Sequence, residues 1–191
     1  MNMEKCDLFS TPIGIVKNLG VLKEITDFIA TKQPTKNFLN DENVCIEFKK
    51  KVIECAKEYM TPHFKFTEVK IHDNWITHNK FTDSTDAHNH PASLIVAVYY
   101  IDNAPKCGDL ILMDPRSGIR WPEIKEYNVV HTTSSNKNTG TTAKRVYRVS
   151  PEKDMLILFP GYLLHSVETN LNPMFIRKSV GINFRVVTER W

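Results

Sequence analysis

Three histidines are the side chains of this 191-residue chain best suited to hold a metal ion. His88 and His90 lie two positions apart, directly before the apolar segment 94–101, and His165 follows another apolar segment, 156–164. Side chains two residues apart on an extended backbone point to the same side, and neutral imidazole is the commonest metal ligand. A lone histidine would be assigned to the surface, but this pair favours a mononuclear metal site with His165 as the third ligand.

A cation and a hydroxyl group follow the third histidine. The segment that holds them alternates between a polar or small face and an apolar face: Arg177, Ser179, Gly181 and Asn183 against Ile176, Val180, Ile182 and Phe184. A strand of this kind normally turns its polar face to water. The alternative is that the polar face lines the cavity of a barrel. Arg177 would then offer a forked donor to a carboxylate, and Ser179 a further hydrogen bond.

Tyr100 is a further candidate for the same cavity. In the expected strand 92–101, even-numbered positions continue the face of His88 and His90 if no bulge intervenes. The phenol of Tyr100 could then bond a ligand carboxylate, while Tyr99 faces away. The alternative is that both tyrosines are core residues.

Two helices and a series of short strands are expected to position these residues. We expect a short strand within 8–18, a helix from Leu22 to about Gln33, and a helix over about 41–59 capped by Asn40 or Asp41. Further strands are expected near 66–77, 92–101, 109–113, 127–132, 144–150, 154–159, 163–168 and 176–188. The pattern predicts a mainly β protein with N-terminal helices (α+β), as in a jelly roll with helices packed on one sheet. We expect a single domain over 1–191, in which residues 1–65 support a β core at 66–191.

The composition limits the function classes. The formal charge of +3 is dispersed, which does not indicate nucleic-acid binding. The four cysteines lack C-x-x-C spacing, nothing at the start resembles a signal peptide, and the longest apolar run is about eight residues against the roughly 20 that cross a bilayer. We expect a soluble cytoplasmic protein with reduced thiols and no membrane partner. The polar stretch 132–144 is either a lid or a disordered loop.

Several motifs together resemble the iron(II)- and 2-oxoglutarate-dependent oxygenase superfamily, most closely a group of small, mostly uncharacterised members. The resemblance covers about residues 74–185. It rests on these segments: His88-x-His90, Val98-Tyr99-Tyr100-Ile101, Gly108-Asp109-Leu110, Asp114-Pro115-Arg116, Phe159-Pro160, His165, Arg177-x-Ser179 and Asn183.

The resemblance implies a double-stranded β-helix, related to the jelly roll and cupin folds, that holds Fe(II) in a facial triad with open positions. It implies 2-oxoglutarate as co-substrate, bound by Arg177, Ser179, Tyr100 and Asn183. Oxidative decarboxylation of 2-oxoglutarate by O2 would be coupled to hydroxylation of a C–H bond. The residues implied in catalysis are the metal ligands and the arginine: His88, His90, His165 and Arg177.

One position departs from the family pattern. The usual triad is His-x-Asp or His-x-Glu plus a distant His, whereas here the second position is His90. Three explanations are open: His90 replaces the carboxylate, a carboxylate comes from Asp86, Asp109 or Asp114, or the site is no longer an oxygenase site. We favour His88, His90 and His165 as the ligands.

Two other function classes compete with the oxygenase. Three histidines with an open position also suit a zinc hydrolase or a cupin-type dioxygenase without co-substrate. A jelly-roll module that binds a protein or sugar without catalysis is the third class. The sequence does not indicate the prime substrate, which can be a small molecule or a protein side chain.

Overall fold

The computed structural model describes residues 10–32, 36–61, 65–115 and 146–188. Its helical part comprises α1 (Leu22–Lys32), the short 3-10 helix η1 (Phe38–Asn40) and α2 (Ile46–Met60). Both expected helices are present. The second begins at Ile46 rather than near Asp41, because turns and bends occupy residues 41–45.

The start of α2 is held by a carboxylate from α1. Cys45 precedes the helix in a left-handed conformation with φ of 46°, and its side chain makes no capping hydrogen bond. The Glu24 carboxylate instead accepts hydrogen bonds of 3.2 and 2.6 Å from two backbone N–H groups in the first turn of α2. The expectation that Asn40 or Asp41 caps this helix is therefore wrong, since the orphan N–H groups find their acceptor on the neighbouring helix.

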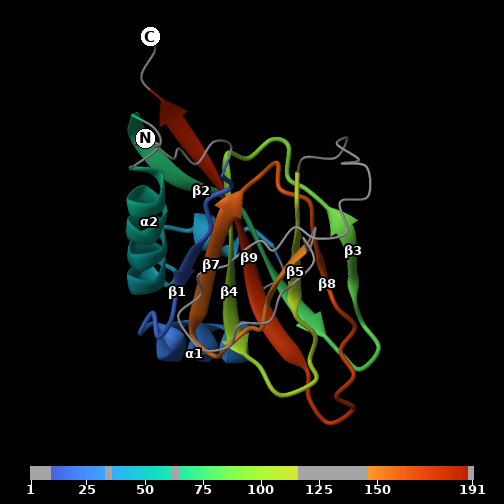
Figure 1. Cartoon of the computed structure of the whole chain (residues 1–191). Coiled ribbons are helices and arrows are strands. Elements are labelled where there is room, and N and C mark those ends of the chain that lie inside the picture. The colour runs from blue at the N-terminus through green and yellow to red at the C-terminus, as the bar shows by residue number, and fades with distance from the viewer. Residues whose placement is uncertain (1–9, 33–35, 62–64, 116–145, 189–191) are drawn as a thin grey trace, which may run out of the picture.

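The strands pair antiparallel in two facing sheets (Figure 1). They are β1 (Gly14–Val16), β2 (Phe66–Asn79), β3 (Thr85–His88), β4 (Ile95–Asp102), β5 (Leu110–Met113), β6 (Val146–Val149), β7 (Met155–Pro160), β8 (His165–Val167) and β9 (Arg177–Thr188). One sheet has the order β1-β7-β4-β9-β2 and the other β3-β8-β5-β6. The expectation of a mainly β double-stranded β-helix with N-terminal helices is confirmed.

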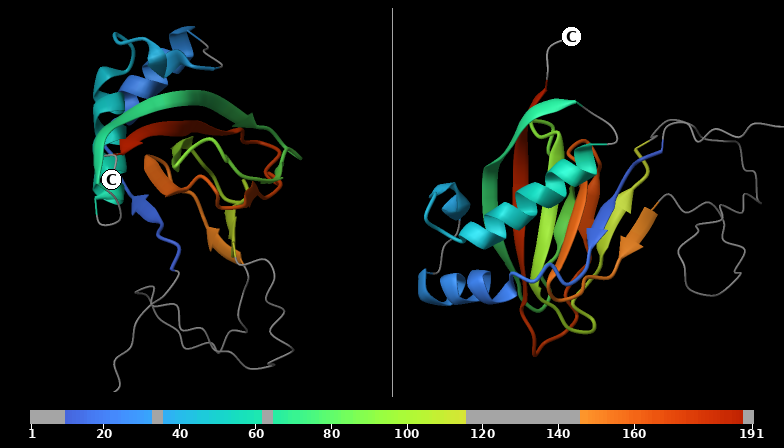
Figure 2. Two further views of the ribbon diagram at one scale, coloured as in Figure 1. Left: turned by 90° about the horizontal axis from the view of Figure 1, so that it is seen from above. Right: turned by 90° about the vertical axis from the view of Figure 1, so that its left-hand side faces the viewer.

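The helices cover the outer face of the five-stranded sheet, away from the other sheet (Figure 2). Phe48 and Val52 of α2 pack there in one buried cluster with Val180, Ile182 and Phe184 of β9. Burial of side chains of this size stabilises the fold by about 1.5–3 kcal/mol each. The apolar face of β9 thus packs under the helices. This is the arrangement expected if the polar face of the strand lines the cavity of a barrel.

The opposite face of β9 points between the sheets. Arg177 is 1% exposed and Ser179 7% exposed, so the alternative that this polar face is turned to water is wrong. A second buried cluster fills the rest of the space between the sheets, with Val96 and Tyr100 of β4 packed against Ile157 and Phe159 of β7. Arg177 and Ser179 therefore lie in the buried space between the sheets.

Some expected elements differ from the structure. β3 was not expected, because Thr85-Asp86-Ala87 has little of the apolar alternation of a strand. The expected strand at 127–132 and the polar stretch 132–144 lie outside the described residues. The expected short strand within 8–18 is present as β1, which pairs with β7 in the larger sheet. No helix in the described ranges is long and apolar enough to cross a membrane.

Candidate metal centre

The three histidines come together at one end of the space between the sheets. His88 ends β3, His165 begins β8, and the two residues are direct partners in the antiparallel ladder. His90 follows in the turn after β3. One ring nitrogen from each histidine lies within 4.8 Å of those of the other two. Among the described residues this is the only group of three or more potential ligands, and it contains no carboxylate.

The turn that carries His90 packs tightly against the loop between β7 and β8. The backbone N–H of His90 donates to the carbonyl of Gly161 at 2.8 Å, and Ser93 donates back to the carbonyl of His90 at 3.0 Å. A Cβ at position 161 would lie 1.8 Å from the Ser93 carbonyl oxygen. Only glycine permits this approach, so Gly161 helps to fix the backbone at His90.

Two of the histidines are oriented by backbone carbonyls. Nδ1 of His88 lies 2.8 Å from the carbonyl oxygen of Asp86, and Nδ1 of His165 lies 2.8 Å from that of Leu163. In the tautomer that donates from Nδ1, each ring keeps Nε2 free as a ligand. Burial lowers the pKa of His165 to about 4, and it also lowers the pKa of His90. These rings are therefore neutral at pH 7, as metal binding requires.

Aromatic rings surround the histidines. His90 stacks on His165, with centroids 5.2 Å apart, and on Trp75 of β2, with centroids 5.6 Å apart. Phe159 meets the His165 ring edge to face at 4.8 Å. Trp75 was missed at the level of the sequence. Only the pairing register, which places it opposite Gly181, brings its indole to the site.

Arg177 lies in the same cavity as the histidines, which has a volume of about 70 Å³. One guanidinium nitrogen donates to the carbonyls of Cys107 and Gly108, at 3.0 and 2.8 Å. Its Nε is buried without a hydrogen-bond partner. Burial lowers the pKa of Arg177, although Tyr100, Cys107 and Asp109 oppose that shift. No carboxylate in the described part of the chain forms an ion pair with this buried cation.

Polar side chains around Arg177 also line the cavity. Ser179 of β9 and Tyr100 of β4 are paired neighbours, and both face it. Burial raises the pKa of Tyr100 to about 12, so its hydroxyl remains a donor at neutral pH. Asn79 of β2 is the direct partner of Arg177. It is 3% exposed, and its Oδ1 has no hydrogen-bond partner. The sequence had given no reason to single out Asn79.

The structure does not bring every candidate residue to this cavity. Asn183 shares the face of Arg177 and Ser179 but lies beyond Gly181 and is not among the lining residues; its Oδ1 is buried and unpaired. Tyr99 faces the helices, where it packs edge to face on Phe48. Asp114 does not line the cavity either.

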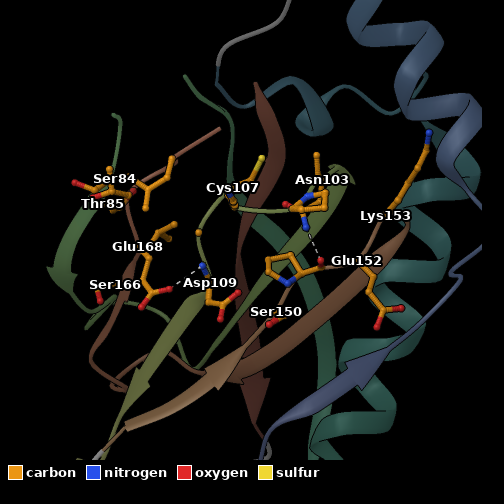
Figure 3. A pocket seen from close by; sticks show the side chains of 18 of the residues that line it. Ser84, Thr85, Asn103, Cys107, Asp109, Ser150, Glu152, Lys153, Ser166 and Glu168 are labelled. Carbon is orange, nitrogen blue, oxygen red and sulfur yellow. Dashed lines mark hydrogen bonds between the residues drawn. The ribbon is translucent and has the colours of Figure 1, made fainter. Parts of the chain in front are cut away.

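Asp86 and Asp109 line a separate, much larger open groove of about 1140 Å³, shown in Figure 3. It is formed by the loops after β4, β6 and β8 together with the start of β3. One of its acidic groups is engaged in the fold, because Glu168 pairs with Arg148 and accepts the backbone N–H of Asp109 at 3.3 Å. None of the three histidines lines this groove. The two aspartates are therefore not placed to complete the histidine cluster.

The residues present fit a transition-metal ion. Metal–nitrogen bonds of about 2.0–2.1 Å would bring ligand nitrogens to about 3 Å from one another, so modest inward rotation of the rings would suffice. Arg177 lines the same cavity and has no carboxylate partner among the described residues, so an anion bound in the cavity would compensate its buried charge.

Comparison with solved structures finds the same fold. This chain is similar to a prolyl-4-hydroxylase from Pseudomonas putida, with 10% identity, a TM-score of 0.60 and coverage of 96% of this chain and 92% of that one. It is similar to HygX from Streptomyces hygroscopicus, solved with nickel and 2-oxoglutarate bound, with 9% identity, a TM-score of 0.62 and coverage of 91% and 81%. A Trichoplax adhaerens prolyl hydroxylase in complex with a hypoxia inducible factor peptide gives 12% identity, a TM-score of 0.58 and coverage of 92% and 83%. At these identities the likeness concerns the fold alone.

Comparison of the sequence with curated proteins gives no match. Residues 73–183, which are more than half of the chain, match the family model described as "Putative 2OG-Fe(II) oxygenase", where 2OG denotes 2-oxoglutarate. The matched range contains the three histidines, Arg177 and Ser179. The chain therefore belongs to this family of 2-oxoglutarate- and Fe(II)-dependent oxygenases.

Proposed function

We propose that the protein is a 2-oxoglutarate- and Fe(II)-dependent dioxygenase that hydroxylates a C–H bond of its prime substrate. His88, His90 and His165 hold the iron, and Arg177 binds the far carboxylate of 2-oxoglutarate. The observation that carries the proposal is the shared cavity, which has a cluster of metal-ligating nitrogens and a buried guanidinium with an unpaired Nε. A structural arginine would have its donors satisfied within the fold.

Each group in the cavity has a role in this proposal. Fe(II) held by the three histidines would supply coordination positions for 2-oxoglutarate and O2. The carbonyls of Asp86 and Leu163 fix Nδ1 of His88 and His165, which would leave Nε2 of each ring free to hold the ion. Arg177, with Ser179 and Tyr100 as further donors, fixes the co-substrate by its far carboxylate. Its keto acid end is thereby left for the metal.

Part of the cavity wall is apolar. Val96, Val98 and Leu110 line the same cavity as the histidines and Arg177. In such a setting, charge-assisted hydrogen bonds are stronger than in water, and competing reactions with water are limited. The cavity, at about 70 Å³, is small compared with ligand pockets of about 300–1,000 Å³.

The test is succinate formation by the purified full chain. Metal-free protein is loaded with Fe(II) under anaerobic conditions, 2-oxoglutarate is added, and O2 is then admitted. We expect a weak visible charge-transfer band before O2, and succinate after it. His165→Ala should abolish both signals, and His72→Ala is the matched control because His72 is exposed on β2.

Two results would count against the proposal. One is succinate at no more than the His165→Ala level, together with no 2-oxoglutarate binding to the Fe(II)-loaded protein. The other is one equivalent of zinc retained after anaerobic purification without any 2-oxoglutarate binding. The second result would favour a hydrolytic zinc site, which a set of three neutral nitrogens also suits.

A further inference from the structure

His90 is held differently from the other two histidines. His88 and His165 each have Nδ1 fixed by a backbone carbonyl. Within the described residues, no hydrogen bond reaches a ring nitrogen of His90. Its ring contacts are instead a stack on Trp75 with an interplanar angle of 24°, a stack on His165 with an angle of 19°, and an edge contact with His88. Aromatic packing, rather than hydrogen bonding, thus determines the plane of the His90 ring.

Trp75 is itself fixed by a residue that lacks a side chain. Trp75 and Gly181 are direct partners in the ladder between β2 and β9. A Cβ at position 181 would lie 2.3 Å from Cε2 and 2.4 Å from Cζ2 of the indole. The indole therefore occupies the space directly over the Gly181 backbone, and any other residue at 181 would displace it.

We propose that Trp75 is a positioning residue for His90, and that Gly181 provides the space that keeps the indole in place. The inference rests on the proposed metal site. It accounts for the departure at position 90: an aspartate has no ring to stack, whereas an imidazole can be oriented by an aromatic face. Trp75, held in place by Gly181, orients the His90 ring, as backbone carbonyls orient the rings of His88 and His165. Groups that orient metal ligands by hydrogen bonds typically contribute about 10–100-fold to metal affinity, and we expect an effect of the same order from this stack.

Trp75 also lines the cavity, so the test must separate a positioning role from a role as a wall. A wall residue affects folding stability or co-substrate binding, but its loss leaves the affinity of the histidines for metal unchanged. A positioning residue acts on metal affinity through His90. Its effect therefore disappears when His90 is removed, and a double-mutant cycle detects that coupling.

The experiment measures Co(II) binding to the metal-free full chain by competition with a chromophoric chelator. We expect Trp75→Leu to weaken Co(II) binding by about tenfold and to alter the visible d–d spectrum, which reports ligand geometry. Trp75→Phe, which keeps an aromatic face, should recover most of the affinity. In the His90→Ala background, Trp75→Leu should change the affinity by less than about twofold.

Gly181→Ala gives an independent test in which Trp75 remains present. The added methyl group displaces the indole, so we expect a loss of Co(II) affinity similar to that of Trp75→Leu. In the Trp75→Leu background the clash is absent, and Gly181→Ala should add little. Thermal melting monitored by circular dichroism establishes whether each variant folds. If Trp75→Leu does not fold, Gly181→Ala and Trp75→Phe test the positioning role in its place.

The inference fails if folded Trp75→Leu and Gly181→Ala bind Co(II) within about twofold of the wild type, or if the Trp75→Leu effect persists undiminished without His90. Failure of the proposed metal site looks different. In that case the wild type binds no stoichiometric Co(II), or His165→Ala binds it as well as the wild type does.

Discussion

Arg177→Met separates a structural arginine from one that binds a ligand. Methionine fills most of the volume of the side chain but carries no charge and no donor. If the fold requires the guanidinium, the variant is strongly destabilised. If the guanidinium serves the co-substrate, stability changes little while 2-oxoglutarate binding is lost. We expect the second outcome.

The size of each effect follows from the surroundings of Arg177. One nitrogen donates to two carbonyls, which is worth about 1.5–3 kcal/mol for each charged hydrogen bond. The opposing term is the cost of burying a cation that is 1% exposed and has no carboxylate partner among the described residues. That cost is several kcal/mol. The two nearly cancel, so the free energy of unfolding should change by no more than about 2 kcal/mol. For 2-oxoglutarate, losing the guanidinium that pairs with its buried carboxylate should reduce the binding free energy by at least about 2 kcal/mol. This corresponds to an increase of about 30-fold in the Kd.

The assay is an anaerobic titration of Fe(II)-loaded protein with 2-oxoglutarate, followed through the charge-transfer band, with urea unfolding as the measure of stability. Lys178→Met is the matched control, because it removes a positive charge from the adjacent residue, which does not line the cavity. The reasoning is refuted if Arg177→Met binds 2-oxoglutarate within about threefold of the control. Unfolding of Arg177→Met with no change in the affinity of the folded fraction would point to a purely structural arginine.

Three further outcomes are expected. Asn79→Asp places a carboxylate on the direct pairing partner of Arg177, in the same cavity, and should weaken 2-oxoglutarate binding at least about tenfold in calorimetric titration, with Co(II) affinity unchanged. Glu24→Ala removes the acceptor at the start of α2 and should lower the free energy of unfolding by about 0.5–2 kcal/mol in urea, with unaltered 2-oxoglutarate binding. Burial lowers the pKa of His165 from 6.5 to about 4, so the unfolded chain binds more protons between these values. The free energy of unfolding of the metal-free protein should therefore fall as the pH drops through this range, by up to about 1.4 kcal/mol per pH unit, and His165→Asn should reduce that slope.

Strand 176–188 could be anticipated because its two faces differ in chemistry. Its alternation of polar and apolar residues left two orientations open, and the structure has the one in which Val180, Ile182 and Phe184 pack under the helices and Arg177 points inward. The period of two in a strand leaves only two orientations, and the expected helices provided a partner for the apolar face.

Features that depend on strand register could not be anticipated. β3 has little apolar alternation and, within the part of the chain that the structure describes, pairs with β8 alone, where it places His88 opposite His165. The role of Trp75 likewise requires the register that sets it against Gly181. The cap of α2 by Glu24 depends on the packing of two helices, while local sequence favoured Asn40 or Asp41. In each case, contacts between distant segments override the local pattern.

The charge of the proposed site bears on what it can bind. Three neutral imidazoles leave the full charge of a divalent ion uncompensated, one unit more positive than with a His-x-Asp triad. Arg177 adds another positive charge in the same cavity, and the walls at Val96 and Val98 lower the local dielectric constant, which makes uncompensated charge costly. A small dianion with one acid group at each end compensates both centres at once, and 2-oxoglutarate has this form. The replacement of a carboxylate by His90 therefore increases the demand of the site for an anionic co-substrate rather than removing it.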